Sequence, residues 1–515
     1  MNLGVRWDYE SPFSERYNKQ VAGFCLSCAS PLQSSVTGLT LNGGLLYTSS
    51  GNRYPYQKDL NNWQPRLGFA YQVTPTTVFR GGYGIIYFNT LESPIGTGFS
   101  QSTSTAGTSS SSPLPQASLS NPFPNGVTLP TGSSAGLSTG IGAGVSFYDP
   151  NHVQPKSTQI SVSLQQQFAG NFSLQLAWVE ARPTQLEVSQ NLNALPQQYY
   201  YTGTDSNTAL ANQNNLNSAV ANPLAGKIPN NNTLNAATIS RSLLDVPYPQ
   251  FSGVTEVGSS IGYQRYDALQ IQVSKPMKHH VAFQGNFTWN KLISHTSFIN
   301  NFGPGTPLSG IQDPGASLVG NVFGTVELPK FQKLNYTERL ALGGWKMSMV
   351  LRAQNGALIS APGGVYQVGD PYPAPHTWQR YFNTCYQNYA GVNVATGTSG
   401  SGASAVPIPA CDGTSPNPAF RQRYSYTLQT NAVYLPLRQR IWPLMDLNVF
   451  KQFALGEGRS FEIRGDFFNV LNRPNFGGPG TGLGSTSYGA IQVGSTLPSQ
   501  ANDARIGQLT ARINF

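Results

Sequence analysis

The sequence predicts an all-β protein in which about 12 antiparallel strands form part of a transmembrane β-barrel, with short turns at one end and long loops at the other. Three observations predict this class. Only 10% of the 515 residues are charged and 11% are aromatic, whereas soluble domains hold about 25% charged residues. Apolar residues alternate with small or polar residues in many short segments. The connections between these segments are alternately long and short.

The alternation is clearest from Thr158 to Phe168, where Ile160, Val162 and Leu164 are separated by small or polar residues. In a barrel strand, every second side chain faces lipid and those between them face the lumen. No helical period explains such runs. The same pattern predicts strands at residues 3–9, 67–73, 79–87, 158–168, 172–178, 269–274, 281–289, 331–340, 345–351, 447–453, 461–467 and 509–515.

The lengths of the connections support a membrane barrel. The long connections are residues 10–65, 89–156, 181–266, 290–330, 355–445 and 471–504. The short ones are residues 74–76, 169–171, 275–280, 342–344 and 454–459. Transmembrane barrels have short periplasmic turns and long extracellular loops, which fits this alternation. A soluble protein rich in hairpins is the alternative, although sandwiches and propellers have no reason to lengthen every second connection.

Composition excludes two other classes of protein. The mean hydropathy is −0.26, and the nearest approach to an apolar run, from Ile85 to Phe88, is far shorter than the roughly 18 residues of a membrane-spanning helix. The formal net charge is +9, but lysine and arginine form no run or stripe, so we predict no nucleic-acid partner. Scattered positive charge suits outer-membrane lipid and anionic lipopolysaccharide instead.

Two connections hold low-complexity segments, Ser100 to Ser120 and Ala395 to Ala405. They cannot bury enough apolar area to offset their ordering entropy, so we expect them to be mobile. Residues 54–56 and 372–376 are better candidates for ligand contact because they combine aromatic residues with proline. Loop packing or an aromatic girdle is the alternative for both segments, and we favour it.

All four cysteines, Cys25, Cys28, Cys385 and Cys411, fall in connections predicted to be extracellular. An exported protein meets an oxidising environment, so we predict a Cys385–Cys411 disulfide and a tight Cys25–Cys28 disulfide. Zinc binding is the alternative, because Cys25 and Cys28 have CxxC spacing. The second pair lacks that spacing, and we therefore predict no metal site.

No motif indicates catalysis. HExxH is absent, and no GxSxG follows a predicted strand. Glu462, Arg464 and Asp466 share one face of a predicted strand and could form an acid/base set, but we favour a charge ladder inside the barrel. The five histidines are scattered along the chain, at His152, His279, His280, His295 and His376. We therefore predict no enzyme activity, no cofactor and no catalytic residue.

The segment from Asp466 to Phe476 resembles the FFNLFNxPNF motif near the end of Oar-like TonB-dependent receptors, which carry a carboxypeptidase-regulatory-like domain. The chain end from Arg512 to Phe515 resembles the terminal aromatic signal read by the barrel-assembly machinery, a role that falls to Phe515. The segment from Trp178 to Leu186 departs from the family pattern. Five further segments resemble motifs of the family in the same order: residues 61–71, 78–84, 266–270, 286–291 and 343–345.

The resemblance implies that residues 1–515 are the C-terminal part of a roughly 22-strand receptor barrel in the outer membrane of a Gram-negative bacterium. The signal peptide, regulatory-like domain, TonB box and plug of that family have no match here. The implied function is TonB-dependent uptake of an unidentified extracellular ligand, such as an oligosaccharide, a peptide or a metal chelate. A non-transporting surface barrel, an adhesin or an assembly scaffold, is the alternative.

About twelve strands of a larger barrel would leave two edges without a partner. These edges are the predicted strands from Leu3 to Tyr9 and from Leu509 to Phe515. Open edges cannot persist in lipid, because their backbone N–H and C=O groups would lack partners. We expect an open arc in this chain rather than a small closed barrel.

Overall fold

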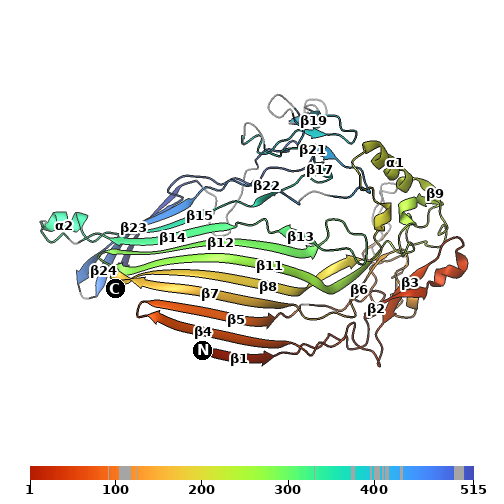
Figure 1. Ribbon diagram of the computed structural model, residues 1–515, viewed down its shortest axis with the longest axis horizontal. Helices are drawn as coiled ribbons and strands as arrows, with labels where there is room; N and C mark the ends of the chain where they lie inside the picture. The colour runs from red at the N-terminus through yellow and green to blue at the C-terminus, as the bar shows by residue number, and fades with distance from the viewer. Residues whose placement is uncertain are drawn as a thin grey trace.

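Twelve antiparallel strands lie side by side in one curved sheet (Figure 1). The computed structural model describes the whole chain except residues 91, 104–116, 125, 330, 334, 373–376, 395–396, 400–405, 409–410, 412–416, 430–432, 457 and 492–503. In the order of the sheet the strands are β1 (Asn2–Trp7), β4 (Trp63–Thr74), β5 (Thr77–Tyr87), β7 (Lys156–Phe168), β8 (Phe172–Asn191), β11 (Gly253–Lys278), β12 (Val281–Ser297), β14 (Leu318–Glu327), β15 (Lys346–Gln354), β23 (Leu444–Gly456), β24 (Arg459–Phe468) and β25 (Ile506–Asn514).

The register of the ladders separates an apolar face from a polar face, as the alternation predicts. On one face Val162 lies opposite Trp178, which lies opposite Leu269, and Leu269 lies opposite Trp289. Three residues along each strand, on the other face, the opposed residues are polar across five strands: Gln165, Gln175, Gln272, Asn286 and Asn321. The apolar face therefore fits contact with lipid, and the polar face fits a wet lumen.

Aromatic side chains mark both ends of the apolar face. Near the short turns, the rings of Phe168 and Phe172 lie 5.5 Å apart, and Phe283 lies 6.2 Å from Phe172. Toward the long loops, Trp7 and Trp63 are 6.3 Å apart. Aromatic residues collect in this way at the two interfaces of membrane barrels. Among the described residues, no helix is long and apolar enough to cross a bilayer.

One predicted strand is wrong. The described residues of 331–340 form no strand; the end of this segment lies in the helix α2 (Tyr336–Leu342), whose N-cap Asn335 and Glu338 form a capping box. The Asn-x-x-Glu spacing is a helix-start signal that outweighs the weak alternation in this segment. The strand between β12 and β15 is β14, in the predicted loop of residues 290–330. As a result, β14 and β15 are joined by residues 328–345, not by the short turn of residues 342–344.

Two glycines explain why the alternation of apolar residues does not predict β14. Gly320 and Gly324 occupy positions on the apolar face where the alternation rule expects large apolar residues. Neighbouring side chains cover them, since a Cβ on Gly320 would lie 3.8 Å from the Phe287 ring and one on Gly324 would lie 3.6 Å from Met349. Large side chains on the adjacent strands therefore supply the apolar surface that β14 itself lacks.

The sheet is open at both edges. β1 pairs only with β4 and β25 pairs only with β24, and no ladder joins β1 to β25 among the described residues. This confirms the expected open arc. The remaining connections keep the predicted order of long and short, so the short turns and α2 lie at one end of the strands and the long loops at the other (Figure 1).

β8 and β11 reach farther toward the loops than predicted. β8 extends to Asn191 and β11 begins at Gly253, where β6 (Gly144–Tyr148) pairs with it in parallel. The outer parts of these strands contain register shifts, one of them between Glu256 and Ser259, and Gln185 has a φ of 59°. Bulges of this kind break the strict alternation on which the predicted strand ends relied.

Candidate functional site

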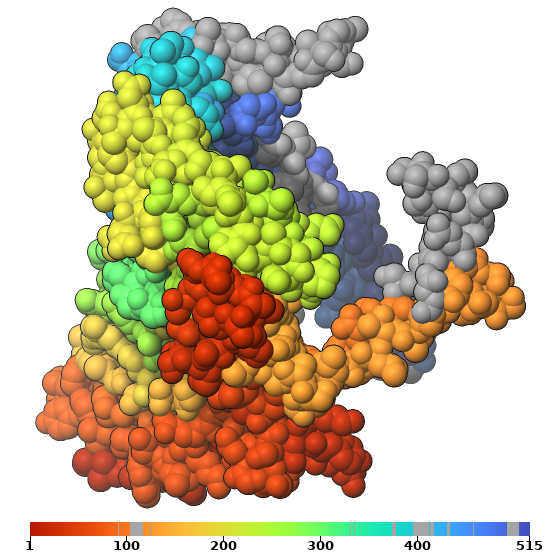
Figure 2. Space-filling view, turned by 90° about the vertical axis from the view of Figure 1, so that its right-hand side faces the viewer, coloured from red at the N-terminus to blue at the C-terminus, as the bar shows by residue number. Residues whose placement is uncertain are grey.

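The long connections pack together into a layer over one end of the sheet. The first three of them are residues 8–62, 88–155 and 192–252. Phe24 in β2 (Val21–Ala29) packs against Phe147 in β6 and Phe251, with ring centroids 5.6 and 5.7 Å apart. Figure 2 looks onto this end and shows the red hairpin of β2 and β3 (Asn42–Tyr47) against the yellow-green third connection. These loops therefore have an apolar core of their own.

The last two connections, residues 355–443 and 469–505, form a second core. The ring of Tyr488 is fully buried and lies 5.3 Å from the ring of Phe382 and 5.9 Å from that of Tyr386. The backbone N–H of Tyr381 donates to the carbonyl oxygen of Gly489 at 2.8 Å. Aromatic packing of one connection into the other holds this part of the layer together.

Hydrogen bonds join the two halves of the layer. The backbone N–H of Tyr201 donates to the carbonyl oxygen of Tyr426 at 2.8 Å, and that of Leu428 donates to the carbonyl oxygen of Tyr201 at 3.1 Å. The side chain of Asn300 exchanges hydrogen bonds of 2.9 and 2.8 Å with the backbone of Gln429. The layer is therefore continuous across the described parts of the third, fourth and fifth connections.

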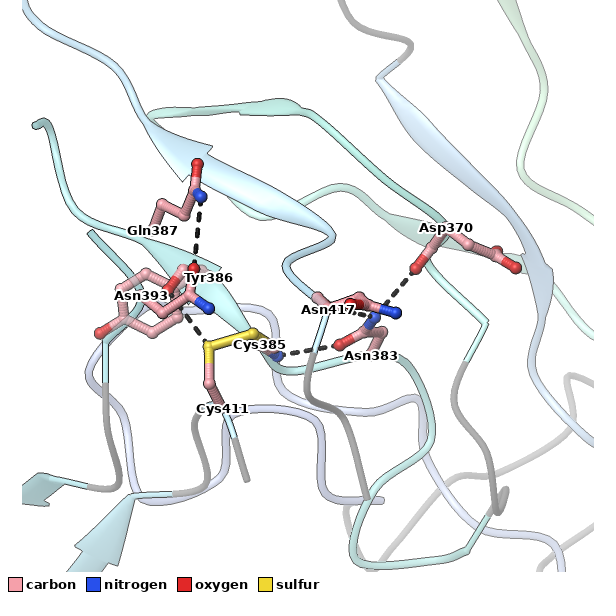
Figure 3. The surroundings of a disulfide bond; sticks show 8 residues. All are labelled: Asp370, Asn383, Cys385, Tyr386, Gln387, Asn393, Cys411 and Asn417. Carbon is pink, nitrogen blue, oxygen red and sulfur yellow. Dashed lines mark hydrogen bonds between the residues drawn. A yellow bond between two sulfur atoms is a disulfide. The ribbon is translucent and has the colours of Figure 1, made fainter. Parts of the chain in front are cut away.

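Both cysteine pairs are bonded and lie in this layer. The Sγ atoms of Cys385 and Cys411 are 2.05 Å apart, and Cys385 is fully buried (Figure 3). Next to the disulfide, the Asn383 side chain donates hydrogen bonds of 3.0 Å to the carbonyl oxygens of Asp370 and Asn417. Together, the disulfide and Asn383 fasten distant parts of the fifth connection to one another.

The second disulfide is local. The Sγ atoms of Cys25 and Cys28 are 1.92 Å apart. This disulfide lies within the register shift between Cys25 and Ala29 at the end of β2. Since both pairs are disulfides, none of the four cysteines offers a thiolate to a metal ion. Phe515, the predicted assembly signal, follows β25 and is 95% exposed.

The candidate ligand segments differ in their surroundings. Tyr56 is half-buried and packs edge-on against Phe13 and Tyr148, so its surroundings match the loop-packing alternative. Tyr54 lies under the Lys58 ammonium at 5.4 Å. Tyr372 is 51% exposed, whereas residues 373–376, including His376, lie outside the described residues. Most of the two low-complexity segments also lies outside them.

The polar residues of β24 form a charge ladder, as the sequence predicts. Arg464 donates to both carboxylate oxygens of Asp466 at 2.9–3.0 Å, and Asn448 donates to Asp466 at 2.6 Å. Glu462 lies opposite Arg512 on the neighbouring strand. With its carboxylate held by Arg464 and Asn448, Asp466 is poorly suited to act as a base.

A buried polar cluster lies where the first two connections meet β8 and β11. His152 is 2% exposed, and its Nδ1 atom lies 2.7 Å from the carbonyl oxygen of Gly258. Its Nε2 atom lies 3.2 Å from Glu92 Oε1 and 3.9 Å from Glu187 Oε1. The hydroxyl of Tyr56 donates a hydrogen bond to Glu92 Oε2. The cluster thus holds one imidazole and two carboxylates within reach of a single bound atom.

Burial dominates the electrostatics of this cluster. It raises the pKa of Glu92, against the opposing effects of the Tyr56 hydrogen bond and of His152, and with added repulsion from Glu187 and Glu10. Burial also raises the pKa of Tyr56, and the hydrogen bond to Glu92 raises it further. Tyr56 therefore stays protonated at neutral pH and remains a hydrogen-bond donor.

Sequence reasoning missed this cluster. Glu92 and His152 lie near the start and the end of one long connection, and Glu187 lies in the outer part of β8. No short motif joins the three positions, and among the histidines nothing local singles out His152. Its only sequence signal is its place just before a predicted strand, which is too weak to identify a ligand.

Nearly the whole chain matches a known family. The model of the outer membrane beta barrel domain matches residues 1–508. The comparison with curated proteins gave no match.

Similar solved structures are distant. The outer membrane transporter YddB from Escherichia coli is 9% identical with a TM-score of 0.36, and 91% of this chain aligns with 42% of that one. The siderophore receptor PiuA from Acinetobacter baumannii is 9% identical with a TM-score of 0.33, at coverages of 92% and 38%. The ferric-catecholate import receptor Fiu from E. coli K12 is 10% identical with a TM-score of 0.34, at coverages of 92% and 37%. The chain spans less than half the length of each.

Proposed function

Because the chain belongs to the outer membrane beta barrel domain family and lies in the outer membrane of a Gram-negative bacterium, we propose that it forms part of the wall of a TonB-dependent receptor. In this proposal the loop layer selects an extracellular ligand, and the TonB complex supplies the energy for uptake. The polar face of the sheet carries the proposal most directly. Rows of Gln, Asn and Ser side chains across neighbouring strands suit a wet passage rather than a packed core.

The open edges support a larger barrel. On the sides of β1 and β25 that pair with no described strand, backbone N–H and C=O groups find no hydrogen-bond partner in lipid. Each such unpaired group costs several kcal/mol. We therefore propose that further strands complete the ring, in line with the resemblance to Oar-like receptors. A barrel of roughly 22 strands leaves room for a plug inside its lumen.

The loop layer offers a surface for ligand capture. Its two apolar cores and the Cys385–Cys411 disulfide stabilise the described part of this layer. Exposed aromatic side chains such as Trp378 and Tyr372, 68% and 51% exposed, stand on this layer. Ordered loops of this kind also suit a non-transporting adhesin or scaffold, which is the second candidate function.

Binding to TonB separates the two functions. The full gene product, extracted from outer membranes in detergent, should be retained on immobilised periplasmic domain of TonB, because a TonB-dependent receptor presents a TonB box to that domain. A porin from the same membranes serves as the control and should pass through. If the protein passes through with the porin, and the gene encodes no plug and no TonB box, the surface-barrel function stands instead.

Labelling in intact cells tests the orientation of the sheet. All four native cysteines are in disulfides, so no native thiol would react with a maleimide and single cysteines can be introduced as labelling sites. Lys227→Cys, at an exposed position of the third long connection, should react with a membrane-impermeant maleimide in intact cells. Ala169→Cys, in the short turn between β7 and β8, should react only after the outer membrane is permeabilised. Labelling of Ala169→Cys in intact cells would reverse the orientation.

A further inference from the structure

Glu92, His152 and Glu187 have the geometry of ligands that share one cation. Their ligand atoms lie within 4.8 Å of one another, and His152 Nε2 lies 3.2 Å from Glu92 Oε1 and 3.9 Å from Glu187 Oε1. Two ligand atoms bound to Zn²⁺ at about 2.0–2.1 Å with a tetrahedral angle are about 3.3 Å apart. The separations between His152 Nε2 and the two carboxylates therefore fit a common ion with little rearrangement.

The hydrogen bond on the far side of the imidazole fixes which nitrogen faces the carboxylates. The carbonyl oxygen of Gly258 can only accept, so His152 Nδ1 carries a proton and donates to it at 2.7 Å. Nε2 is then the nitrogen with a lone pair when the ring is neutral. Metal-bound histidines in proteins are held in this way, with the second nitrogen donating to a carbonyl or a carboxylate.

Glu92 provides an independent sign that a cation belongs here. Its side chain is only 5% exposed, yet no donor among the described residues hydrogen-bonds to its Oε1 atom, which points at His152 Nε2. Oε2 is satisfied by the Tyr56 hydroxyl. A buried carboxylate oxygen without a donor is costly, and a cation between Oε1 and Nε2 would remove that cost.

We infer that Glu92, His152 and Glu187 bind a divalent transition-metal ion of the Zn²⁺ class. One imidazole nitrogen with two carboxylate oxygens is a ligand set suited to such an ion. Tyr56 acts as a positioning residue by holding Glu92 Oε2, and Gly258 does the same for His152. Glu187, whose side chain is 37% exposed, forms the side of the site that is open to solvent.

The ion would fasten a loop to the sheet. Glu92 follows β5 and His152 precedes β7, so the two residues lie near the two ends of the connection of residues 88–155. Glu187 lies on β8, the strand that follows β7 in the sheet. A shared ion would hold both ends of this connection against β8, at the base of the loop layer. This role does not depend on which ligand the receptor takes up.

Cobalt binding tests the site, because Co²⁺ occupies zinc sites and has visible absorption bands that report nitrogen and oxygen ligation. The full gene product is purified in detergent, treated with a chelator and titrated with Co²⁺. We expect one equivalent to bind, with competition by Zn²⁺. His152→Gln should abolish binding, and Glu187→Gln should weaken it at least tenfold, since even loss of an outer-shell partner costs about 10- to 100-fold in affinity.

Two comparisons keep the test decisive. Glu187 is partly exposed, so Glu187→Gln should fold even if His152→Gln does not. His279→Asn changes an exposed histidine in the turn between β11 and β12, at a positive φ that asparagine accepts, and should bind Co²⁺ as the native protein does. If the native protein binds no ion, or if Glu187→Gln binds as tightly as the native protein, the cluster is a histidine–carboxylate ion pair and the inference is wrong.

Discussion

Val162→Arg is expected to destabilise the membrane-inserted protein by about 2–4 kcal/mol, whereas Ser161→Arg should cost far less. Val162 lies on the apolar face, opposite Gly81 and Trp178, and Ser161 lies on the polar face, opposite Gly82. An arginine that faces lipid must leave water or deform the bilayer, while one that faces the lumen keeps its hydration. The two adjacent positions therefore separate the two faces of the sheet.

The depth of Val162 sets the size of this effect. It lies six residues before Phe168, the residue at the end of β7, or about 20 Å along the strand. With a strand tilt of about 40°, that is about 15 Å above the turn, near the middle of an apolar band about 25 Å tall. Denaturant titration of the protein in lipid vesicles measures the difference. Equal penalties for the two variants would mean that β7 is shifted by one residue or does not contact lipid.

Strands were predictable where the membrane imposes a strict rule on every second side chain. Lipid on one face and water on the other force the alternation seen in β7 and β12, and the structure confirms it. The rule fails where a neighbour supplies the apolar surface, as Phe287 and Met349 do beside Gly320 and Gly324. It also fails beyond the membrane, where bulges in β8 and β11 reset the alternation.

The loop layer was much less predictable because its contacts join residues far apart in the chain. The sequence predicted both disulfide pairs from the setting of the cysteines, and both pairs are bonded in the structure. Nothing in the sequence indicates that Glu92, His152 and Glu187 meet, since each lies in a segment without a local motif. Only the pairing of β5, β7 and β8 brings their segments together, and no local pattern encodes that placement.

The second large effect is expected in the loop layer, at Tyr488. Its ring is fully buried between the connections of residues 355–443 and 469–505, against Phe382 and Tyr386. Truncating a buried aromatic side chain to alanine costs about 3–5 kcal/mol when the cavity cannot collapse. Tyr488→Ala should therefore raise the population of the opened loops about 100- to 4,000-fold, at about 1.4 kcal/mol for each factor of ten.

Limited trypsin digestion of outer membranes measures that opening, because the connection of residues 355–443 contains Arg380 and Arg421. When the loops reclose faster than the protease cuts, the cleavage rate follows the population of the open form. Tyr488→Phe is the matched control. It keeps the ring and removes a hydroxyl that no described residue hydrogen-bonds, so its protection should equal or exceed that of the native protein. Cleavage of Tyr488→Ala at the native rate would show that the two connections hold together without this ring, and that the core around Phe382 does not stabilise the layer.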